Sequence, residues 1–290
     1  MFNILVTGAN GQLGNEMRTA LPQNNIPGNY FFTDVDELDI TNKLAVRNFI
    51  SGNKIDIIIN CAAYTAVDAA QDDFLSASRI NINAVANIAD AATVNNAKII
   101  HISTDYVFDG YNYRPYTEDD RTSPQSIYGS TKLEGEHILQ TIAPDSIIIR
   151  TSWLYSPYGK NFVKTMLKLG REKEAVNVVC DQIGTPTYAA DLAGAIAAVL
   201  GSGKWISGIY HFSGEGACSW YDFTKSIHRI AGITSCNVLP VRSSEYPSKV
   251  QRPFYSVLDK TKIKENYNIN IPYWEESLQK CIRILEQTDK

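Results

Sequence analysis

Residues 2–14 read FNILVTGANGQLG, and this stretch decides the fold of the chain. Its first six residues have the apolar, β-rich composition of a buried strand, and glycines follow at positions 8, 11 and 14 as a helical pattern begins. In such a turn the first glycine permits a tight bend, the second lets the backbone approach a pyrophosphate, and the third lets the helix pack closely on the strand. The N–H groups at the helix start attract phosphate. We therefore expect a dinucleotide-binding loop at Gly8, Gly11 and Gly14.

Short apolar runs and helical patterns alternate along much of the remaining chain. Strands are predicted at Phe2–Thr7, Tyr30–Thr33, Ile55–Asn60, Lys98–Ile102, Ser146–Arg150 and Gly208–Phe212. Helices are predicted at Gln12–Leu21, Thr41–Ile50, Ile80–Val94 and Tyr128–Ile142. The alternation is typical of the α/β class and predicts a Rossmann-like, doubly wound parallel sheet with helices on both faces. In such a sheet, ligands bind beyond the carboxyl ends of the strands.

The sequence changes in character after Arg150, where aromatic segments bearing Pro or Gly separate fewer regular elements. We predict that residues 1–150 form the dinucleotide-binding Rossmann domain and that the chain returns to it near residues 189–212. Residues 151–188 and 213–290 are predicted to form a smaller, interwoven substrate-binding lobe. Because no low-complexity linker separates the two parts, several crossings should join them.

Composition limits the possible function classes. The chain has 290 residues, 44% of them hydrophobic, and a net charge of −4 without blocks of like charge, so it offers no basic stripe for nucleic acid. No apolar run approaches the ~18 to 20 residues of a membrane helix. We therefore expect a cytoplasmic protein with a small-molecule substrate. The cysteines show neither CxxC spacing nor a neighbouring His, so no metal site is predicted at Cys61, Cys180, Cys218, Cys236 or Cys281.

Polar and small residues follow the second and third predicted strands. Asp34 lies ~20 residues beyond the last loop glycine, where an acid can accept hydrogen bonds from the adenosine ribose hydroxyls. A carboxylate there opposes a 2′-phosphate, yet no neighbouring Arg argues clearly for one, so the choice between NADH and NADPH stays open. Asp39-Ile40 and Ala62-Ala63 add small or polar groups at the same sheet edge.

The stretch Tyr128-Gly-Ser-Thr-Lys132 begins a predicted helix after Pro124, and its spacing puts the phenol and the ammonium on one face. A neighbouring cation typically lowers the pKa of an acid by ~1 to 3 units. We therefore expect Lys132 to lower the pKa of Tyr128, which could then donate a proton to a developing alkoxide. Lys132 could also hold the nicotinamide ribose. Thr104 ends the preceding strand, where its hydroxyl can hydrogen-bond a substrate oxygen.

Longer motifs extend these observations over nearly the whole chain. They are GANGQLG (8–14), NCAAYTAVD (60–68), STDYVFDG (103–110), YGSTKLEGE (128–136), RTSW (150–153), GKNF (159–162) and DQIGTPT (181–187). With this set the chain resembles the extended short-chain dehydrogenase/reductase superfamily and, within it, the dTDP-4-dehydrorhamnose reductases. The 103–110 and 181–187 strings are much more specific than the glycine loop.

The resemblance implies reduction of the C4 keto group of dTDP-4-dehydro-L-rhamnose by hydride from NADPH or NADH, for cell-surface polysaccharide. It implies catalytic roles for Thr104, Tyr128 and Lys132 and substrate contacts at Thr104, Asp105, Tyr106 and Trp153. Cofactor contacts are implied at Asn10, Gly11, Gln12, Leu13, Asp39, Ile40, Ala62, Ala63, Tyr64 and Thr65. Trp153 could instead be a packed core aromatic. The family is also described with a magnesium ion that supports a homodimer, but the sequence has no dense carboxylate cluster that predicts this ion.

Alternative functions remain within the same fold. A nucleotide-sugar dehydratase commonly follows the catalytic Thr with an Asp-Glu pair, whereas here Asp105-Tyr106 follows Thr104, which favours simple reduction. Close sequence relatives also include the regulatory subunit of methionine adenosyltransferase, a binding partner without primary catalysis. The presence of Thr104, Tyr128 and Lys132 together favours an enzyme.

Overall fold

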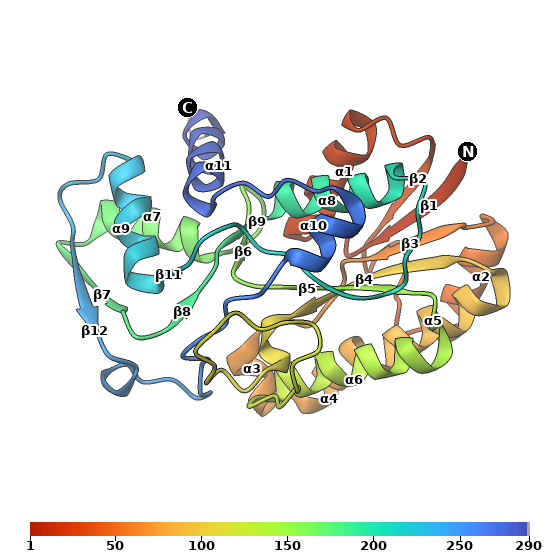
Figure 1. Cartoon of the computed structure of the whole chain (residues 1–290), viewed down its shortest axis with the longest axis horizontal. Coiled ribbons are helices and arrows are strands. Elements are labelled where there is room, and N and C mark those ends of the chain that lie inside the picture. The colour runs from red at the N-terminus through yellow and green to blue at the C-terminus, as the bar shows by residue number, and fades with distance from the viewer. Residues whose placement is uncertain (289–290) are drawn as a thin grey trace.

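Parallel strands form the central sheet of the computed structural model, which describes residues 1–288 (Figure 1). Within that range the order across the sheet is β2-β1-β3-β4-β5-β10, and every neighbouring pair is parallel. The strands are β1 (Phe2–Thr7), β2 (Gly28–Thr33), β3 (Ile57–Asn60), β4 (Lys98–Thr104), β5 (Ile147–Thr151) and β10 (Gly208–His211). The predicted α/β class and doubly wound parallel sheet are confirmed, and the order reverses direction beside β1, where such sheets bind their ligands.

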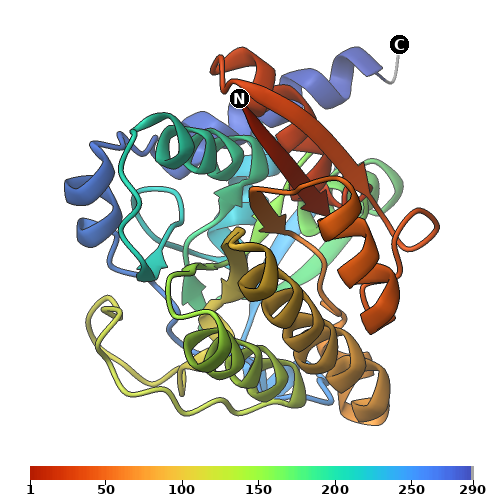
Figure 2. The ribbon, with the colours of Figure 1, turned by 90° about the vertical axis from the view of Figure 1, so that its right-hand side faces the viewer.

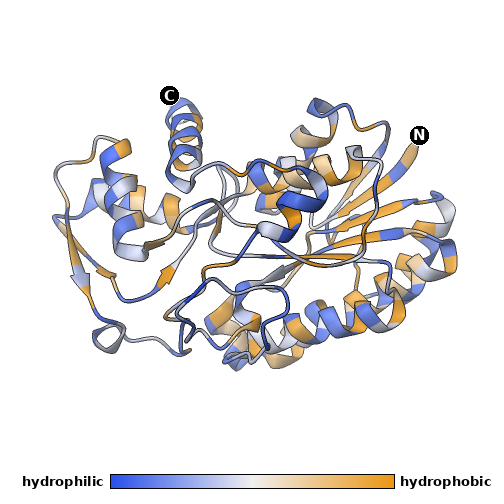
Figure 3. Cartoon of the chain, in the orientation of Figure 1, coloured by the Kyte–Doolittle hydropathy of each residue, from blue (hydrophilic) through white to orange (hydrophobic). Residues whose placement is uncertain are grey.

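Helices cover both faces of this sheet (Figure 1). One face carries α1 (Gln12–Gln23), α8 (Ala189–Gly201) and α10 (Thr261–Tyr267), and the other carries α2 (Lys43–Gly52), α5 (Ala84–Asn95) and α6 (Ile127–Ile142). Side chains alternate along each strand, so Ile4 and Val6 pack toward α1 and α8 while Leu5 packs toward α2 and α5. Figure 2 shows α5 and α6 side by side, and Figure 3 shows the apolar character of the buried strands.

A second hydrophobic core lies beside the sheet. It is formed by α7 (Phe162–Glu172), α9 (Trp220–Ile230) and α11 (Trp274–Thr288) with the parallel pair β7 (Ala175–Val179) and β12 (Asn237–Val241). Phe223 lies near its centre and contacts the rings of Trp153, Phe162 and Trp274. The short pairs β6 (Leu154–Tyr155) with β9 (Thr187–Tyr188), and β8 (Ile183–Gly184) with β11 (Cys218–Ser219), connect this lobe to the main sheet.

The chain crosses between the two cores more than once. After β9 it returns to the main core through α8 and β10. It returns again at α10, where Ile263, Tyr267 and Ile271 join the core of the main sheet. We expected these residues in the smaller lobe. Their apolar side chains, spaced four residues apart, cover the edge strand β10. The sequence analysis predicted no helix that would cover this strand.

A buried ion pair ties α6 to β5 below the carboxyl edge of the sheet. Arg150 donates to Glu136 through Nε and Nη2, with the shortest contact at 2.6 Å, and both side chains are almost fully buried. Ser103 of β4 also donates to Glu136. Through Glu136, helix α6 is therefore joined to both β4 and β5.

Replacing Glu136→Gln should leave the Arg150 guanidinium buried without a counter-charge. We expect a loss of about 3 to 5 kcal/mol in the free energy of unfolding, measured by urea denaturation. Glu172→Gln is the matched control, because Glu172 is exposed and pairs with Lys168 at only 4.0 Å. That variant should lose less than about 0.5 kcal/mol. Similar losses in both variants would contradict a structural role for the buried pair.

Candidate active site

The glycine loop brings β1, β3 and α1 into backbone contact. Gly8 has φ of +64°, and a Cβ atom there would lie 2.7 Å from the Cα of Ala62. A Cβ on Gly14 would lie 2.3 Å from the carbonyl oxygen of Gly8. The residue that precedes α1, Gly11, has no side chain to cap the helix, so the first N–H groups of α1 have no such partner. This is the arrangement that a pyrophosphate requires.

A cavity of about 280 Å³ opens beside this loop at the carboxyl edge of β1, β2 and β3. Seven residues predicted to contact the cofactor line it, namely Gly8, Gly11, Asp34, Asp39, Ile40, Ala62 and Ala63. Arg79 also lines it, a cation that the sequence analysis did not identify. Hydrogen bonds from Thr41 and the positive charge of Arg79 lower the pKa of Asp39. The cavity therefore combines backbone donors, small side chains and charges of both signs.

The other residues predicted at the cofactor have structural contacts of their own. The carboxylate of Asp34 accepts the backbone N–H of Asn10 at 2.9 Å, which holds the loop against the end of β2. Gln12 accepts a hydrogen bond from Asn161 at 2.9 Å and so joins the loop to the second lobe.

Leu13 is buried in the main core, whereas Thr65 is exposed. The backbone of Tyr64 exchanges two hydrogen bonds with the Asn81 side chain.

Two of the three residues predicted to be catalytic, Thr104 and Tyr128, meet where β4 ends and α6 begins. Tyr128 is about nine-tenths buried and Thr104 almost fully so. Burial raises the pKa of the Tyr128 phenol above its usual value, while a side-chain hydrogen bond with Thr104 lowers it. The negative charge of Asp105 raises it further. The phenol is therefore a proton-bearing group at neutral pH, held beside a hydroxyl.

Lys132 is directed toward the sheet. Its Nζ donates to the carbonyl oxygen of Ile102 at 2.6 Å and lies 3.2 Å from Nε2 of His101. Burial lowers the pKa of Lys132 to about 8, although the charge of Glu136 opposes this change. We expected Lys132 to lower the pKa of Tyr128, and the structure differs: the pKa of Tyr128 is raised, because burial outweighs the other influences on it.

Close packing at the start of α6 determines where the phenol lies. Ser126 caps the helix by accepting the N–H of Gly129 at 3.1 Å, so the helix begins at Ile127, one residue before the predicted start. A Cβ on Gly129 would lie 2.2 Å from the carbonyl oxygen of Tyr106. The ring of Tyr106 packs edge-on against that of Tyr128, with centroids 5.4 Å apart. The first turn of α6 is thereby pressed against the segment that carries Thr104.

Asp105 is a buried acid one residue beyond Thr104. The Thr104 hydroxyl donates to its carboxylate at 3.0 Å. Burial raises the pKa of Asp105 to about 6, and hydrogen bonds with Ser256 and Thr104 limit the rise. The carboxyl group of Asp105, which was predicted to contact substrate, is therefore largely protonated and uncharged below pH 6.

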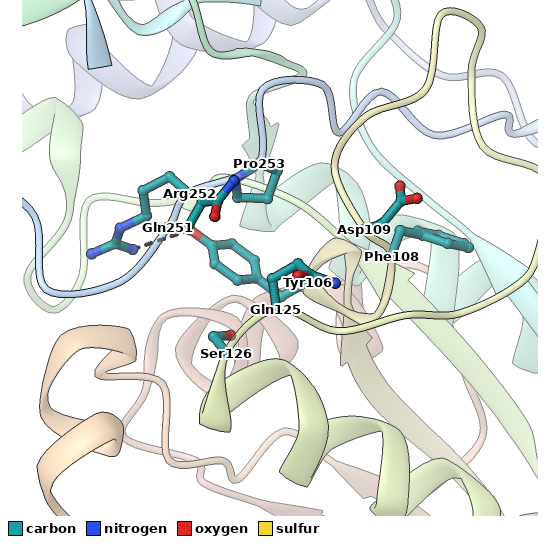
Figure 4. A pocket seen from close by; sticks show the side chains of 8 residues that line it. All are labelled: Tyr106, Phe108, Asp109, Gln125, Ser126, Gln251, Arg252 and Pro253. Carbon is teal, nitrogen blue, oxygen red and sulfur yellow. Dashed lines mark hydrogen bonds between the residues drawn. The ribbon is translucent and has the colours of Figure 1, made fainter. Parts of the chain in front are cut away.

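Tyr106 also contacts a distant part of the chain. Its hydroxyl accepts a hydrogen bond from Arg252 at 3.1 Å, as Figure 4 shows. Arg252 pairs in turn with Asp68 of α3 (Val67–Asp72). A small pocket between these elements is lined by Tyr106, Phe108, Asp109, Gln125, Ser126, Gln251, Arg252 and Pro253. The segment around residue 252 therefore covers the outer side of the Tyr106 ring.

Trp153 is partly buried and packs against the second hydrophobic core. Its ring stacks on Trp220 with centroids 3.5 Å apart, and its backbone has φ of +48°. A Cβ on Gly184 would lie 2.5 Å from the Trp153 ring. Both packing and substrate contact remain compatible with this partly buried side chain.

Residues 1–288 contain no cluster of three or more His, Cys, Asp or Glu side chains that could hold a metal ion. In the same range, no helix has the length and apolar character needed to cross a membrane.

The fold and the site together define a dinucleotide-binding enzyme of the short-chain dehydrogenase/reductase type. The family model described as "RmlD substrate binding domain" matches residues 2–287. The chain belongs to the dTDP-4-dehydrorhamnose reductase family of oxidoreductases.

Individual relatives agree with this assignment. A dTDP-4-dehydrorhamnose reductase from Aggregatibacter actinomycetemcomitans is 44% identical, covering 96% of this chain and 98% of its own. The spore coat polysaccharide biosynthesis protein SpsK of Bacillus subtilis is 40% identical, with 98% of each chain covered. The crystal structure of a dTDP-4-dehydrorhamnose reductase from Bacillus anthracis, in complex with NADP, has a TM-score of 0.92 and 40% identity over 98% of this chain and 99% of its own.

Several residues at the site were missed by the sequence analysis. Asn81 and Arg79 lie on a π-helical segment (Arg79–Asn83), a feature that often marks functional sites but that hydrophobic periodicity does not reveal. His101 was included in a predicted strand, and only its contact with Lys132 distinguishes it. Arg252 and Ser256 lie far along the chain, within the predicted lobe 213–290, where no local pattern distinguishes them.

Gly129→Ala should push α6 away from the Tyr106 carbonyl, because the added methyl group has no space. We expect a loss of at least ~10-fold in turnover, together with a loss of stability of about 1 to 3 kcal/mol. Gly194→Ala is the matched control, since Gly194 also lies within a helix but a Cβ there meets no atom within 4 Å. That variant should gain up to about 1 kcal/mol. Equal activity in the two variants would contradict the role assigned to this contact.

Asp105→Asn should change the pH dependence of stability. Because the folded-state pKa of Asp105 is raised from 3.8 to about 6, the folded protein binds more protons between these values, and this group lowers stability as pH rises through them. Relative to wild type, the variant should therefore gain up to about 3 kcal/mol between pH 4 and pH 7 in urea denaturation. Asp119→Asn, at an exposed position in the following loop, controls for net charge. A constant difference between Asp105→Asn and wild type would refute the assignment.

Proposed function

We propose that this protein reduces the C4 keto group of dTDP-4-dehydro-L-rhamnose to give dTDP-L-rhamnose, with reduced nicotinamide dinucleotide as hydride donor. The observation that carries the proposal is the position of Tyr128, buried beside Thr104 at the carboxyl edge of a sheet that bears a glycine loop. Relatives that are 36–44% identical over nearly the whole chain and are named for this reaction support it.

The residues present fit a dinucleotide. Glycines occupy the places where a Cβ would overlap backbone, and the start of α1 offers N–H groups without a side-chain cap. The 280 Å³ cavity has room for the adenosine end, with Asp34 and Asp39 available to ribose hydroxyls and Arg79 to a phosphate. Arg79 makes NADPH as suitable as NADH. The NADP complex of the Bacillus anthracis relative is consistent with this.

The chain's own residues supply the proton and the hydrogen bonds. The bound cofactor supplies hydride to the ketone carbon, so negative charge develops on the ketone oxygen. Thr104 and Tyr128 lie together where donors to that oxygen are needed, and Tyr128 gives it a proton. Lys132, one helical turn further, serves the cofactor ribose. Asp105, Tyr106 and Trp153 contact the sugar nucleotide, with the lobe around Phe223 forming the other wall of the site.

The test follows loss of the absorbance of reduced nicotinamide with the dTDP-4-keto sugar generated in place, comparing NADPH with NADH. Turnover to a dTDP-6-deoxyhexose with the L-rhamno configuration, identified by NMR, would support the proposal. Absence of turnover with both cofactors, combined with a stoichiometric complex with a methionine adenosyltransferase catalytic subunit, would favour the regulatory alternative.

Tyr128→Phe removes the proton donor while keeping the ring in place. We expect turnover to fall by ~10² to 10⁴-fold, because general acid catalysis is lost, with cofactor affinity nearly unchanged. Tyr116→Phe is a suitable control, since Tyr116 is also buried but its hydroxyl donates to Asp109, outside the catalytic group. Retention of most activity in Tyr128→Phe would mean that another acid donates the proton.

A further inference from the structure

A chain of buried polar side chains runs beneath the catalytic group. It begins at Thr7 on β1, passes through Asn60 at the end of β3 and His101 on β4, and ends at Lys132 on α6. All four residues are at most 1% exposed. The mechanism proposed above uses Lys132 but gives no role to His101. The directions of the hydrogen bonds in this chain decide which atoms carry protons.

The orientation of the Asn60 amide is determined by two donors. Its Oδ1 accepts the hydroxyl of Thr7 at 2.7 Å and the backbone N–H of Ala62 at 3.2 Å. Because a backbone N–H can only donate, the amide oxygen must lie on this side. The amide nitrogen Nδ2 therefore faces Nδ1 of His101, at 3.0 Å.

This contact selects one tautomer of His101. The NH2 group of Asn60 can only donate, so Nδ1 must accept and carries no proton. A neutral imidazole then carries its proton on Nε2. Burial, and the positive charge that Lys132 has when protonated, hold the pKa of His101 well below its usual value, which keeps the ring neutral. Nε2–H thus points at Nζ of Lys132, 3.2 Å away.

An ammonium cannot accept that hydrogen. A protonated Lys132 would present a donor to a donor, whereas a neutral amine has a lone pair for Nε2–H and still donates to the carbonyl of Ile102. The other ionisable groups that influence Lys132 are Glu136 on its own helix, which favours the ammonium, and Cys61 after β3. Burial raises the pKa of the Cys61 thiol to about 12, so it stays uncharged.

We propose that, at mildly alkaline pH, His101 is a positioning residue that holds Lys132 as a neutral amine in the cofactor-free protein, and that Lys132 takes up a proton when the dinucleotide binds. The proton comes from the buffer acid in the solvent, which is left as its conjugate base, and it bonds to the Nζ lone pair; this breaks the hydrogen bond from His101 Nε2–H. The ammonium then repels this N–H and is free to serve the cofactor ribose. The role of Lys132 at the cofactor rests on the proposed function, whereas the tautomer of His101 does not.

The first test reads the tautomer directly by long-range ¹H–¹⁵N NMR on cofactor-free protein labelled with [¹⁵N]histidine. The chain contains four histidines, and two of them serve as internal references for the two neutral tautomers. His211 donates from Nδ1 to the carbonyl of Tyr116, and His228 donates from Nε2 to the carbonyl of Met166. His101 should show the pattern of His228, unchanged between pH 6 and 9. The pattern of His211, or an imidazolium, would overturn the proposal.

The second test counts protons by titration calorimetry of NADPH binding at pH 8.5 in buffers of different ionisation enthalpy. In His101→Gln, an amide oxygen can accept from the Lys132 ammonium, so the free protein should already hold the proton. Wild type should take up between about half and one proton more than this variant, because the pKa of Lys132 is about 8. Protons taken up by the NADPH phosphate are common to both and cancel in the difference.

His137→Gln is the matched control, since His137 is an exposed residue on α6 and should match wild type. Equal proton uptake in wild type and His101→Gln would overturn the proposal. Neither test requires the sugar substrate. A protein that binds NADPH with proton uptake but does not reduce the dTDP-4-keto sugar would therefore disprove the proposed function while supporting the role of His101. If His101→Gln does not fold, the first test still decides whether the proposal holds, because it measures the His101 tautomer in the wild-type protein.

Discussion

The active site depends on the backbone contact between Gly129 at the start of α6 and the carbonyl oxygen of Tyr106 after β4. A side chain at position 129 would lie 2.2 Å from that oxygen, so only glycine allows the helix to come so near the sheet. The contact brings Tyr128 beside Thr104 and lets Lys132, one turn later, reach the backbone of β4. Because these distances are set by backbone rather than by flexible side chains, the groups that we propose to be catalytic are positioned by the fold itself.

Loss of hydration is the main electrostatic influence on the same groups. Burial raises the pKa of Tyr128 and Asp105 and lowers that of Lys132, so each group is shifted toward its uncharged form. The charged side chains of Arg150 and Glu136 lie farther inside the protein, where they form an ion pair and neutralise each other. A site with little charge of its own responds strongly to charge that develops on a substrate, because electrostatic interactions are stronger where water is excluded.

Distant segments complete the site, and these explain why part of it could not be predicted. Arg252 reaches Tyr106 from 146 residues away, and Ser256 reaches Asp105 from the same segment. Asn81 joins Tyr64 to Thr131 on α6, which no local pattern indicates. The pKa of Tyr128 was expected to fall because a lysine lies four residues away, but spacing along a helix says nothing about the carbonyl and imidazole toward which that lysine points.

The sequence by itself determined the alternation of strands and helices in the main sheet, the parallel arrangement of that sheet and the glycine loop. Periodicity and turn chemistry are local properties, so the strands around Leu5, Ile58 and Ile148 could be predicted from short windows. The tertiary structure alone decided the partners: which carbonyl faces Gly129, which imidazole faces Lys132 and which arginine covers Tyr106. Such contacts, and the protonation states that follow from them, arise from burial among residues far apart in the chain, and burial of this kind has no signature in a single stretch of sequence.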